Sequence, residues 1–392
     1  MRKTIDAVVA GHICLDMTPI IEVETTPQIK DLFSPGKLIN LNGVEISSGG
    51  SVANTGFALS KLGLSVMPIS SIGDDGFGKL LKKIIDEQIG IDIKSSHMTA
   101  TSYSIILSIK GIDRIILHDP AGNNNFNTKS IDFDIVKNSK LFHFGYPPLM
   151  RKMFENEGYE LQKTFRRVKE LDVTTSLDMS LPDANSESGK LNWESILSKT
   201  LQYVDVFLPS VEEALYTFDK EEFNRVKRAA CNDDFTSHID LEKIIKLGEK
   251  ILGLGCAIAV IKCGDKGIYI KTNGLERLKK LGKASPAKIN KWADQEIFEE
   301  TYEVKNFKSA LAAGDTTIAG FLGAFIGGYD IYESAKISCQ VGALCCTTYD
   351  AVSAICDIEQ IKMQVDQLPR KNTYDDLKTY FEYDNSRSVW FR

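Results

Sequence analysis

The sequence predicts a three-layer α/β fold built on a doubly wound, mostly parallel sheet. Short apolar runs bounded by turn residues recur along the chain, and stretches of helical character separate them. Strands that alternate with helices in this way are typical of a parallel sheet. The 392 residues are 43% hydrophobic and 26% charged, which suits a globular protein with a large core. The length allows one large domain or two, and we expect a single domain over residues 1–392.

The expected elements follow one another in the order of a doubly wound layout. Strands are predicted at residues 7–10, 66–72, 141–144, 174–177, 204–208 and 257–261. Helices are predicted at residues 52–62, 78–88, 159–171, 241–252 and 316–327.

Two segments depart from this alternation and have β character. Residues 20–48 are rich in Val, Ile and Thr, and residues 101–117 alternate apolar and polar side chains around a hairpin-like turn at 110–114. Both leave the main sheet near the same end. From the residues alone, they are either an ordinary β excursion or a small β-sheet lid that covers a site.

Two later stretches stand out by composition. Residues 272–303 are charged, with several lysines followed by glutamates, and we interpret them as a surface insertion. Residues 369–392 are rich in aromatic side chains, which is unlike a free linker. We expect this C-terminal extension to pack on the domain or on a partner subunit.

Charge and hydropathy exclude several classes of function. Lys and Arg number 47 against 53 Asp and Glu, so the net charge is −6 and no overall field favours nucleic acid. No segment reaches the roughly 20 apolar residues that cross a bilayer. We therefore expect a cytoplasmic protein that binds neither nucleic acid nor a membrane.

The cysteines and histidines give no sign of a metal site. The eight cysteines form no C-x-x-C pair, and we interpret them as small buried side chains in a reducing compartment. His12, His118 and His143 lack the spacing to Cys, His or carboxylate residues that is typical of metal ligands. We interpret them as core or substrate-edge residues.

Residues 312–317, Ala-Ala-Gly-Asp-Thr-Thr, precede an apolar helix and are the most informative stretch. Small residues let the backbone turn tightly, and the unpaired N–H groups at a helix start favour an anion such as phosphate. A carboxylate repels phosphate, so proton removal from an attacking hydroxyl explains Asp315 better than anion binding does. Taken alone, the motif is also an ordinary N-terminal cap.

A second glycine turn feeds another helix at residues 49–63. Val52, Phe57, Leu59 and Leu62 can face a core. Asn54 in the first helical turn can both donate and accept hydrogen bonds, which suits a sugar hydroxyl.

In this order, the two motifs resemble the signatures of the ribokinase-like, or phosphofructokinase B type, sugar kinase family. The resemblance extends from about residue 5 to residue 356. Further segments that look like family strands and turns are residues 7–16, 71–78, 204–214 and 260–267. The resemblance implies a ribokinase-like fold whose β segments, about residues 17–48 and 99–120, form a lid over the sugar.

The resemblance also implies a role for particular residues. Asp315 would accept the proton of the substrate hydroxyl. The expected phosphate anion hole consists of Ala312, Ala313 and Gly314. The expected substrate-binding residues are Asp16, Gly49, Gly50 and Asn54. Each of these residues has a structural alternative, since Asp16, for example, would also serve simply as the end of a strand.

ATP, Mg²⁺ and a monovalent cation are the cofactors that the resemblance implies. Lys262, Gly264 and Gly267 would lie on the nucleotide side, although the two glycines also suit a tight turn. Glu213 would reach Mg²⁺ through water, because this ion dehydrates reluctantly, or would only cap the helix that follows Pro209. The lid edges could pair two subunits into a homodimer.

Four positions depart from the family pattern. Ala312 replaces the usual glycine at the start of the anion-hole turn, and Thr317 replaces a common aromatic residue. Ser210 stands where the magnesium-side Asn is usual, and Asp350 replaces a late nucleotide-side glycine. Alanine tolerates most turn geometries except positive φ, so activity is still expected.

The resulting expectation is an ATP-dependent sugar kinase that transfers the γ-phosphate of MgATP to a hydroxyl of a fructose-, ribose- or sugar-acid-like substrate. The alternatives are a nucleoside kinase, which needs an additional apolar slot for a base, and a catalytically silent, sugar-sensing relative. A nicotinamide-binding protein is excluded, because no G-x-G-x-x-G follows the first strand.

Overall fold

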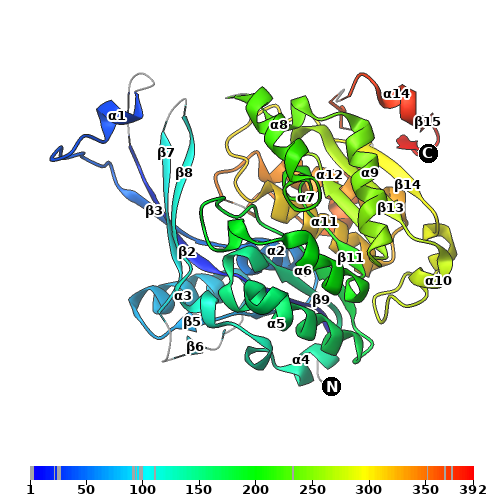
Figure 1. Ribbon diagram of the computed structural model, residues 1–392, viewed down its shortest axis with the longest axis horizontal. Coiled ribbons are helices and arrows are strands. Elements are labelled where there is room, and N and C mark those ends of the chain that lie inside the picture. The colour runs from blue at the N-terminus through cyan, green and yellow to red at the C-terminus, as the bar shows by residue number, and fades with distance from the viewer. Residues whose placement is uncertain are drawn as a thin grey trace.

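The computed structural model describes residues 4–21, 23, 28–90, 93, 95–96, 100–109, 112–231, 234–350, 352–365, 368–371 and 374–392. Within these residues, helices cover both faces of a ten-stranded main sheet, and a separate four-stranded sheet projects from one end of the molecule (Figure 1). This architecture confirms the predicted fold class.

The main sheet is parallel in one half and antiparallel in the other. From edge to edge it consists of β15 (Glu382–Asp384), β16 (Val389–Phe391), β14 (Glu296–Glu300), β13 (Gly267–Thr272), β12 (Ile258–Lys262), β11 (Val206–Phe207), β10 (Thr174–Leu177), β9 (Ser139–Gly145), β1 (Ile5–Gly11) and β4 (Val66–Ile69). The strands from β12 to β4 pair in parallel. Their carboxyl ends therefore share one edge of the sheet, where ligands bind in open α/β folds.

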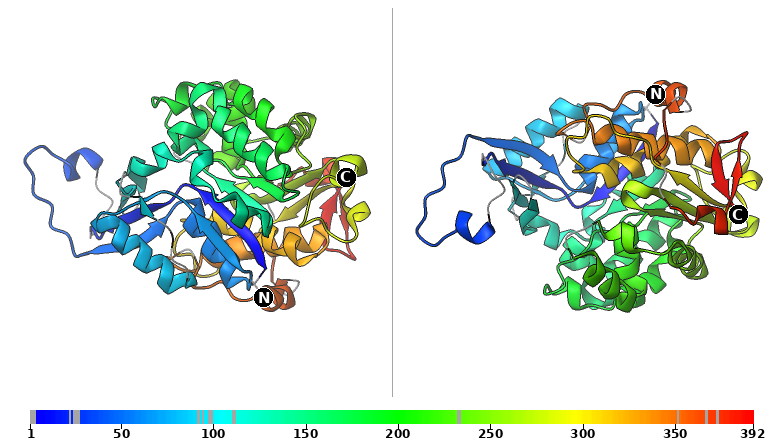
Figure 2. Two further views of the ribbon diagram at one scale, coloured as in Figure 1. Left: turned by 90° about the horizontal axis from the view of Figure 1, so that it is seen from below. Right: turned by 90° about the horizontal axis from the view of Figure 1, so that it is seen from above.

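Two layers of helices enclose this sheet (Figure 2). One layer contains α2 (Ser51–Lys61), α3 (Gly76–Ile89), α10 (Leu275–Leu278), α11 (Ala313–Gly327), α12 (Ile331–Cys345) and α13 (Ile358–Val365). The other contains α4 (Phe133–Lys137), α5 (Arg151–Lys169), α6 (Trp193–Thr200), α7 (Val211–Phe218), α8 (Lys220–Ala230), α9 (Leu241–Gly253) and α14 (Leu377–Tyr380). In the described chain, none of these helices has the length and apolar character that a membrane crossing requires.

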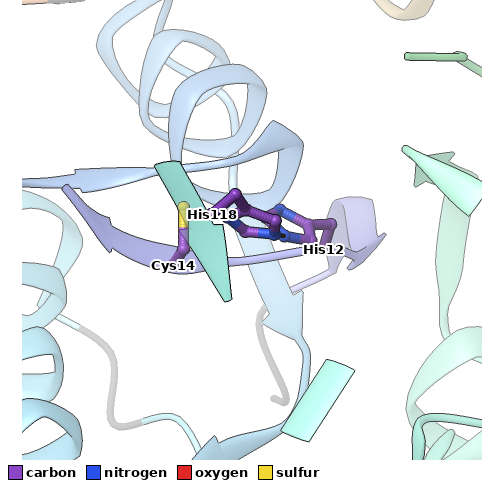
Figure 3. A group of neighbouring side chains, drawn as sticks. All are labelled: His12, Cys14 and His118. Atoms are coloured by element: carbon purple, nitrogen blue, oxygen red, sulfur yellow. Dashed lines mark hydrogen bonds between the residues drawn. The ribbon is translucent and has the colours of Figure 1, made fainter. Parts of the chain in front are cut away.

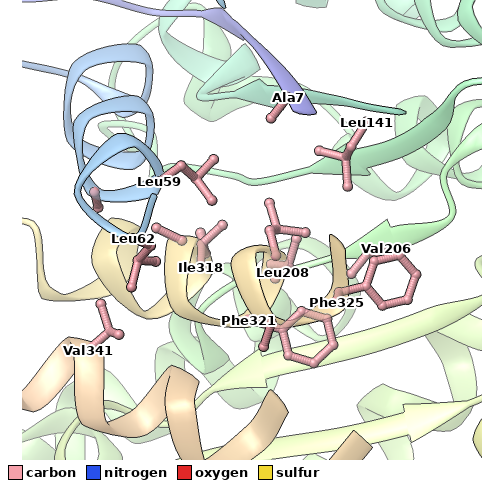
Figure 4. Packing of buried hydrophobic residues seen from close by; sticks show 14 of the residues in the cluster. Ala7, Leu59, Leu62, Leu141, Val206, Leu208, Ile318, Phe321, Phe325 and Val341 are labelled. Atoms are coloured by element: carbon pink, nitrogen blue, oxygen red, sulfur yellow. The ribbon is translucent and has the colours of Figure 1, made fainter. Parts of the chain in front are cut away.

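The core lies on both sides of the sheet because its strands bury both faces. Along β1, Ala7 and Val9 belong to one buried cluster, whereas Val8 and Ala10 belong to the other. This division follows from the alternation of side chains along a strand. Helix α11 is apolar on all sides because it lies between the sheet, α2 and α12. Figure 4 shows its buried side chains among those of the strands and α2.

The predicted strand at residues 66–72 is interrupted. It forms β4 at the edge of the main sheet and then β5 (Ile72–Gly73), which pairs with β6 (Ser95–Ser96) in a separate two-stranded sheet. Between them, Ser70 Oγ donates to the Gly11 carbonyl at 2.6 Å. Pro68 lies in β4, where an edge position tolerates the missing N–H.

The four-stranded sheet comes from the two β segments that the sequence singled out. Its order is β3 (Val44–Gly49), β2 (Cys14–Pro19), β7 (Tyr103–Ile109) and β8 (Ile112–Asp119), and α1 (Ile29–Leu32) lies between β2 and β3. The sheet starts from the main body, since β2 follows β1 after two residues. Of the predicted segments, residues 22, 24–27, 99 and 110–111, which include part of the hairpin turn, lie outside the described residues.

The surface interpretation of residues 272–303 is wrong for their last part. Residues 296–300 form β14, a fully buried strand of the main sheet that pairs with β13. Glu296, Glu299 and Glu300 are therefore buried carboxylates. Burial raises the pKa of Glu299 to about 7, although the neighbouring Arg370 opposes this rise.

The C-terminal extension packs on the domain and supplies the partners of these glutamates. Its strand β16 pairs with β14. Arg370 donates two hydrogen bonds to Glu299 Oε1 at 3.0 and 2.9 Å, and Trp390 Nε1 donates to Glu300 Oε2 at 2.9 Å. The expectation that this aromatic tail packs against the protein is confirmed.

Candidate active site

Several polar residues meet where the parallel strands end. His12, Tyr146 and Asp178 directly follow β1, β9 and β10, and Lys262 ends β12. Because these strands are neighbours, the four side chains approach one edge of the sheet from adjacent positions. The first turn of α11 faces the same edge, since Tyr146 reaches Asp315.

Asp315 is held in place by three donors, the side chains of Asn54, Thr55 and Tyr146. Asn54 Nδ2 of α2 donates to Asp315 Oδ2 at 2.9 Å. The Tyr146 hydroxyl lies 2.9 Å from Oδ1 and 2.8 Å from Oδ2. The carboxylate is only 4% exposed, and the structure shows no ion pair to it among the described residues. A buried carboxylate without a cationic partner in direct contact is well suited to accept a proton.

The electrostatics support this role. Burial raises the pKa of Asp315, and the hydrogen bonds from Asn54 and Tyr146 partly oppose the rise. Burial, together with the nearby Asp315 carboxylate, raises the pKa of Tyr146 well above its ordinary value. Tyr146 therefore stays protonated and donates to Asp315. A carboxylate whose pKa lies closer to neutrality is a stronger base than an ordinary aspartate.

The start of α11 offers backbone N–H groups at part of the predicted anion hole. The N–H of Ala313 already donates to the Ala310 carbonyl at 3.2 Å. Gly314 and Asp315 lie in the first helical turn, where backbone N–H groups have no partner within the helix. An added side chain on Gly314 would come within 4.0 Å of Lys262 Nζ, so an ammonium group lies beside this turn. The turn thus offers both N–H groups and a positive charge to an anion.

Ala312 adopts the conformation that the sequence analysis identified as unfavourable. Its φ is 61°, in the left-handed region, as the N-cap of α11. An L-residue there costs about 1–2 kcal/mol relative to the right-handed conformation. The usual glycine would not bear this cost. The turn keeps its shape nevertheless, because α11 is packed on all sides.

Replacing Ala312 by Gly should stabilise the protein. The gain from relieved strain, about 1–2 kcal/mol, exceeds the loss from the freer unfolded chain, about 0.4–1 kcal/mol. We expect the free energy of unfolding to rise by about 0.5–1 kcal/mol in urea denaturation. Ala313→Gly is the matched control and should lower it by about 0.5–1 kcal/mol, because Ala313 is helical. A lower stability of Ala312→Gly would show that the turn is not strained.

Lys262 and Asp178 form a buried ion pair at the same edge. Lys262 Nζ lies 2.7 Å from Asp178 Oδ1, and the two side chains are 11% and 2% exposed. Burial lowers the pKa of Lys262, but Asp178 and Glu213 raise it by more, so the ammonium group stays charged. The pair thus places a positive charge beside Gly314.

A cavity of about 1020 Å³ opens on this side of the site. All three predicted nucleotide-side residues, Lys262, Gly264 and Gly267, line it, together with Ala313 and Gly314. Its volume is at the upper end of the range for small-molecule sites, about 300–1,000 Å³. The sequence analysis missed contributions to this cavity from residues 301–305, from α12 and from Lys371.

Asp16, Gly49 and Gly50 lie close together, and Asn54 contacts Asp315. Asp16 on β2 is 8% exposed, and burial raises its pKa. A side chain on Gly49 would lie 2.0 Å from Asp16 Oδ2, and one on Gly50 would lie 2.6 Å from His12 Nδ1. These glycines therefore let the backbone approach Asp16 and His12. Asn54, expected to bind a sugar hydroxyl, donates its amide hydrogen to Asp315.

Glu213 caps a helix, which is the structural alternative that the sequence analysis left open. Ser210 N donates to Glu213 Oε2 at 2.6 Å, and Glu213 N donates to Ser210 Oγ at 3.1 Å. This reciprocal pair is a capping box at the start of α7. Ser210, a departure from the family pattern, is thus a helix cap. Glu213 still lies near enough to Lys262 to raise the pKa of that ammonium group.

The other departures also have local roles. Thr317 Oγ1 donates to the Ala313 carbonyl at 2.7 Å and so stabilises the first turn of α11. A side chain on Gly342 of α12 would lie 2.2 Å from that hydroxyl, so the two helices are in close contact there. Asp350 accepts hydrogen bonds from the backbone and side chain of Ser353 in an exposed loop.

Comparison with known proteins identifies the family. The model of the pfkB family carbohydrate kinases matches residues 8–357. The chain belongs to this family. Carbohydrate kinases are phosphotransferases, so the predicted family and enzyme class are confirmed. The match includes the turn at residues 312–317 and the glycine turn at residues 49–63, on which the prediction depended.

Curated relatives of this pfkB-family chain are sugar kinases. An ATP-dependent 6-phosphofructokinase of Thermoanaerobacterium thermosaccharolyticum is 25% identical over 319 residues, which are 81% of this chain and 84% of the relative. An uncharacterized sugar kinase of Archaeoglobus fulgidus is 26% identical over 296 residues, which are 75% of this chain and 96% of the relative.

Solved structures show the same fold. The ribokinase of Arabidopsis thaliana, complexed with ribose and ATP, has a TM-score of 0.67 and 17% sequence identity, with 93% of this chain and 99% of that chain covered. Ribokinase from Thermotoga maritima has a TM-score of 0.63 and 18% identity, with 92% and 99% covered. At these identities the likeness shows the fold alone, and it confirms the ribokinase-like architecture.

Proposed function

We propose that this pfkB-family protein transfers the γ-phosphate of MgATP to a hydroxyl of a small carbohydrate. The observation that carries the proposal is the buried Asp315 carboxylate, held by Asn54 and Tyr146 in the first turn of α11. That turn also borders the cavity lined by Lys262 and the two glycines that follow it. The proposed base and the proposed phosphate site thus share one helix start.

The proposed step needs little besides positioning and charge neutralisation. Asp315 accepts the proton of the substrate hydroxyl as that oxygen forms a bond to the γ-phosphorus. The bond from the γ-phosphorus to its bridging oxygen breaks, and ADP leaves. Gly314 and Asp315 offer backbone N–H groups to the transferring phosphate, and the Lys262 ammonium group neutralises developing charge.

Carboxylates near the phosphate site support the proposed use of Mg²⁺. Glu213, Asp178 and Asp315 all lie near enough to Lys262 to raise the pKa of its ammonium group. Carboxylate oxygen atoms suit Mg²⁺. When bound, the ion would neutralise phosphate charge, with Glu213 as the residue proposed to hold it through water. The monovalent cation stays a prediction.

We also propose that the four-stranded sheet is the lid over the sugar, which Asp16, Gly49, Gly50 and Asn54 would bind. Support comes from Asp16, which lies on β2, and from His118 of β8, whose Nε2 lies 3.1 Å from His12 Nε2 of the main body. Hydrogen exchange in residues 17–48 and 99–120 should slow when sugar binds. Unchanged exchange in both segments would count against closure.

The homodimer through this sheet likewise stays a prediction. Val44, Ile46, Ile116 and Leu117 are large hydrophobic side chains on β3 and β8, and they are 43 to 55% exposed. Such side chains on a small sheet support pairing between two copies. Sedimentation velocity measures the oligomeric state directly.

The proposed activity is tested by ATP consumption over a panel of ketoses, aldoses, sugar acids and nucleosides. We expect one class of sugar to be turned over far faster than the others. Preference for a nucleoside would identify the protein as a nucleoside kinase. Sugar binding without ATP consumption, measured by calorimetry, would instead identify a catalytically silent relative and overturn the proposal.

Tyr146→Phe should move the pH dependence of the reaction. The Tyr146 hydroxyl stabilises the ionised form of Asp315, so its removal raises the pKa of this carboxyl further. A base acts only when deprotonated, so activity should be lost earlier as the pH falls. Because one hydrogen bond to a charged group contributes about 1.5–3 kcal/mol, the pH at which kcat/KM falls on the acidic side should rise by about one to two units.

The matched control for this experiment is Tyr216→Phe. The Tyr216 hydroxyl donates to the Gly189 carbonyl at 2.6 Å and is also buried, but it belongs to α7. This variant should keep the acidic limb of the parent protein. If the limb of Tyr146→Phe also stays in place, Tyr146 does not set the basicity of Asp315.

A further inference from the structure

His12, Cys14 and His118 form a cluster at the junction of the two sheets, although their spacing in the sequence is not typical of metal ligands (Figure 3). One ring nitrogen of each histidine and the Cys14 sulfur all lie within 4.8 Å of one another. His12 follows β1, Cys14 begins β2, and His118 lies on β8. We propose that these three side chains bind a soft or borderline transition metal, Zn²⁺ above all, at this junction.

The geometry suits zinc. His12 Nε2 and His118 Nε2 lie 3.1 Å apart. Two nitrogens, each 2.0–2.1 Å from a tetrahedral zinc ion, are about 3.4 Å apart, so the rings need to separate only slightly. Two imidazoles and a thiolate are the donor set that zinc sites use, whereas Mg²⁺ and Ca²⁺ prefer oxygen. The donors therefore favour zinc over the magnesium expected at the phosphate site.

A second group of contacts orients the proposed ligands. Ser104 Oγ lies 3.2 Å from His118 Nδ1 and 3.6 Å from Cys14 Sγ, so one hydroxyl contacts two ligands. Such outer contacts fix the ring that a metal binds. His12 Nδ1 is buried and has no hydrogen-bond partner among the described residues. The Nδ1 atom of His12 is therefore still available for a hydrogen bond.

The Cys14 thiol is already directed at a carboxylate. Its sulfur lies 3.2 Å from Asp16 Oδ1, to which the thiol donates. Zinc binding would break the S–H bond, form a bond from sulfur to the metal and release the proton to solvent. The positive ion would then take the place of that proton between sulfur and carboxylate. Asp16 is not part of the cluster itself and would lie beside the metal as an outer contact of Cys14.

A metal ion at this junction would also affect the proposed kinase site. It would join β8 of the small sheet to the start of β2, and it would remove the thiol proton that Cys14 donates to Asp16, a proposed sugar ligand. Zinc and sugar should therefore compete, which raises KM for the sugar with little change in kcat. This consequence rests on the proposed function, whereas the metal site itself does not.

The metal site is tested with Co²⁺ and Zn²⁺ on the full chain after treatment with a chelator. One equivalent of Co²⁺ should give the intense bands of a tetrahedral site with sulfur ligation, and Zn²⁺ should displace it. Cys14→Ser should abolish the sulfur-to-cobalt band, and His118→Gln should weaken metal binding by about tenfold or more. Cys231→Ser, which removes an exposed thiol elsewhere, should change neither.

X-ray absorption at the zinc edge provides a test that needs no variant. The parent protein should show one sulfur at about 2.3 Å and two nitrogens at about 2.0–2.1 Å from zinc. A shell of oxygen atoms alone, or a cobalt–sulfur band that persists in Cys14→Ser, would overturn the inference. Absence of kinase activity with an intact cobalt spectrum would reject the proposed function but leave the metal site standing.

Discussion

Asp315→Asn should lower kcat by about 10²- to 10⁴-fold, the range in which a general base contributes. Asparagine has nearly the same shape and can still accept hydrogen bonds from Asn54 and Tyr146, whose contacts hold the side chain. It cannot accept the proton of an incoming hydroxyl. Sugar and ATP should therefore still bind, and calorimetry should give dissociation constants close to those of the parent protein.

Asp134→Asn is the matched control for this substitution. Asp134 is also an acid in the first turn of a helix, α4, but its side chain is exposed on the other layer. This variant should keep the turnover of the parent protein in a steady-state ATP assay. If Asp315→Asn kept nearly full turnover on the best substrate, Asp315 would not be the base.

Lys262→Met should have the largest effect on stability. It leaves the Asp178 carboxylate buried without its partner, and loss of one member of a buried ion pair costs about 3–5 kcal/mol. Denaturation in urea should show a free energy of unfolding lowered by about this amount. Turnover should also fall, because the positive charge beside Gly314 is lost from the phosphate site.

A double variant separates these two effects. In Lys262→Met with Asp178→Leu, no buried charge is left unpaired, so most of the lost stability should return. Turnover should not return, since the ammonium group is still missing. Recovery of both quantities would mean that Lys262 has only a structural role.

Lys169→Met provides a comparison at a second buried pair. Lys169 Nζ lies 2.7 Å from Asp205 Oδ2, but Asp205 also pairs with Arg277 at 3.0 Å. The remaining partner should limit the loss of stability to less than that of Lys262→Met. Turnover should not change, because this pair lies at the amino-terminal side of β11, away from the proposed phosphate site.

The parts of the site that the sequence predicted are those with local signals. The turn at residues 312–317 combines small residues with an acid at a helix start, and the strand at 174–177 has the predicted bounds. Tyr146 and Asp178 were missed, although each is the first residue after a predicted or observed buried strand. Polar residues at the carboxyl ends of parallel strands are a signal that could have found both.

Other features could not be predicted because their partners are distant in the chain. His12 and His118 are 106 residues apart, so no local spacing connects them. The role of Asn54 in sugar binding stays a proposal, but its contact with Asp315, 261 residues further along, was not predicted. In both cases the residue type was informative about chemistry, whereas the contact depended on which strands and helices become neighbours.

The pairing of β14 with β16 bears on how the protein is made. Glu300 and Trp390 are 90 residues apart, so β14 leaves the ribosome well before the strand that will cover it. During that interval the nascent chain exposes a strand edge, which is prone to join other chains. Glu299 and Glu300 then lack the contacts with Arg370 and Trp390, and charge on an open edge discourages aggregation. The same carboxylates that need partners in the finished protein thus protect the unfinished one.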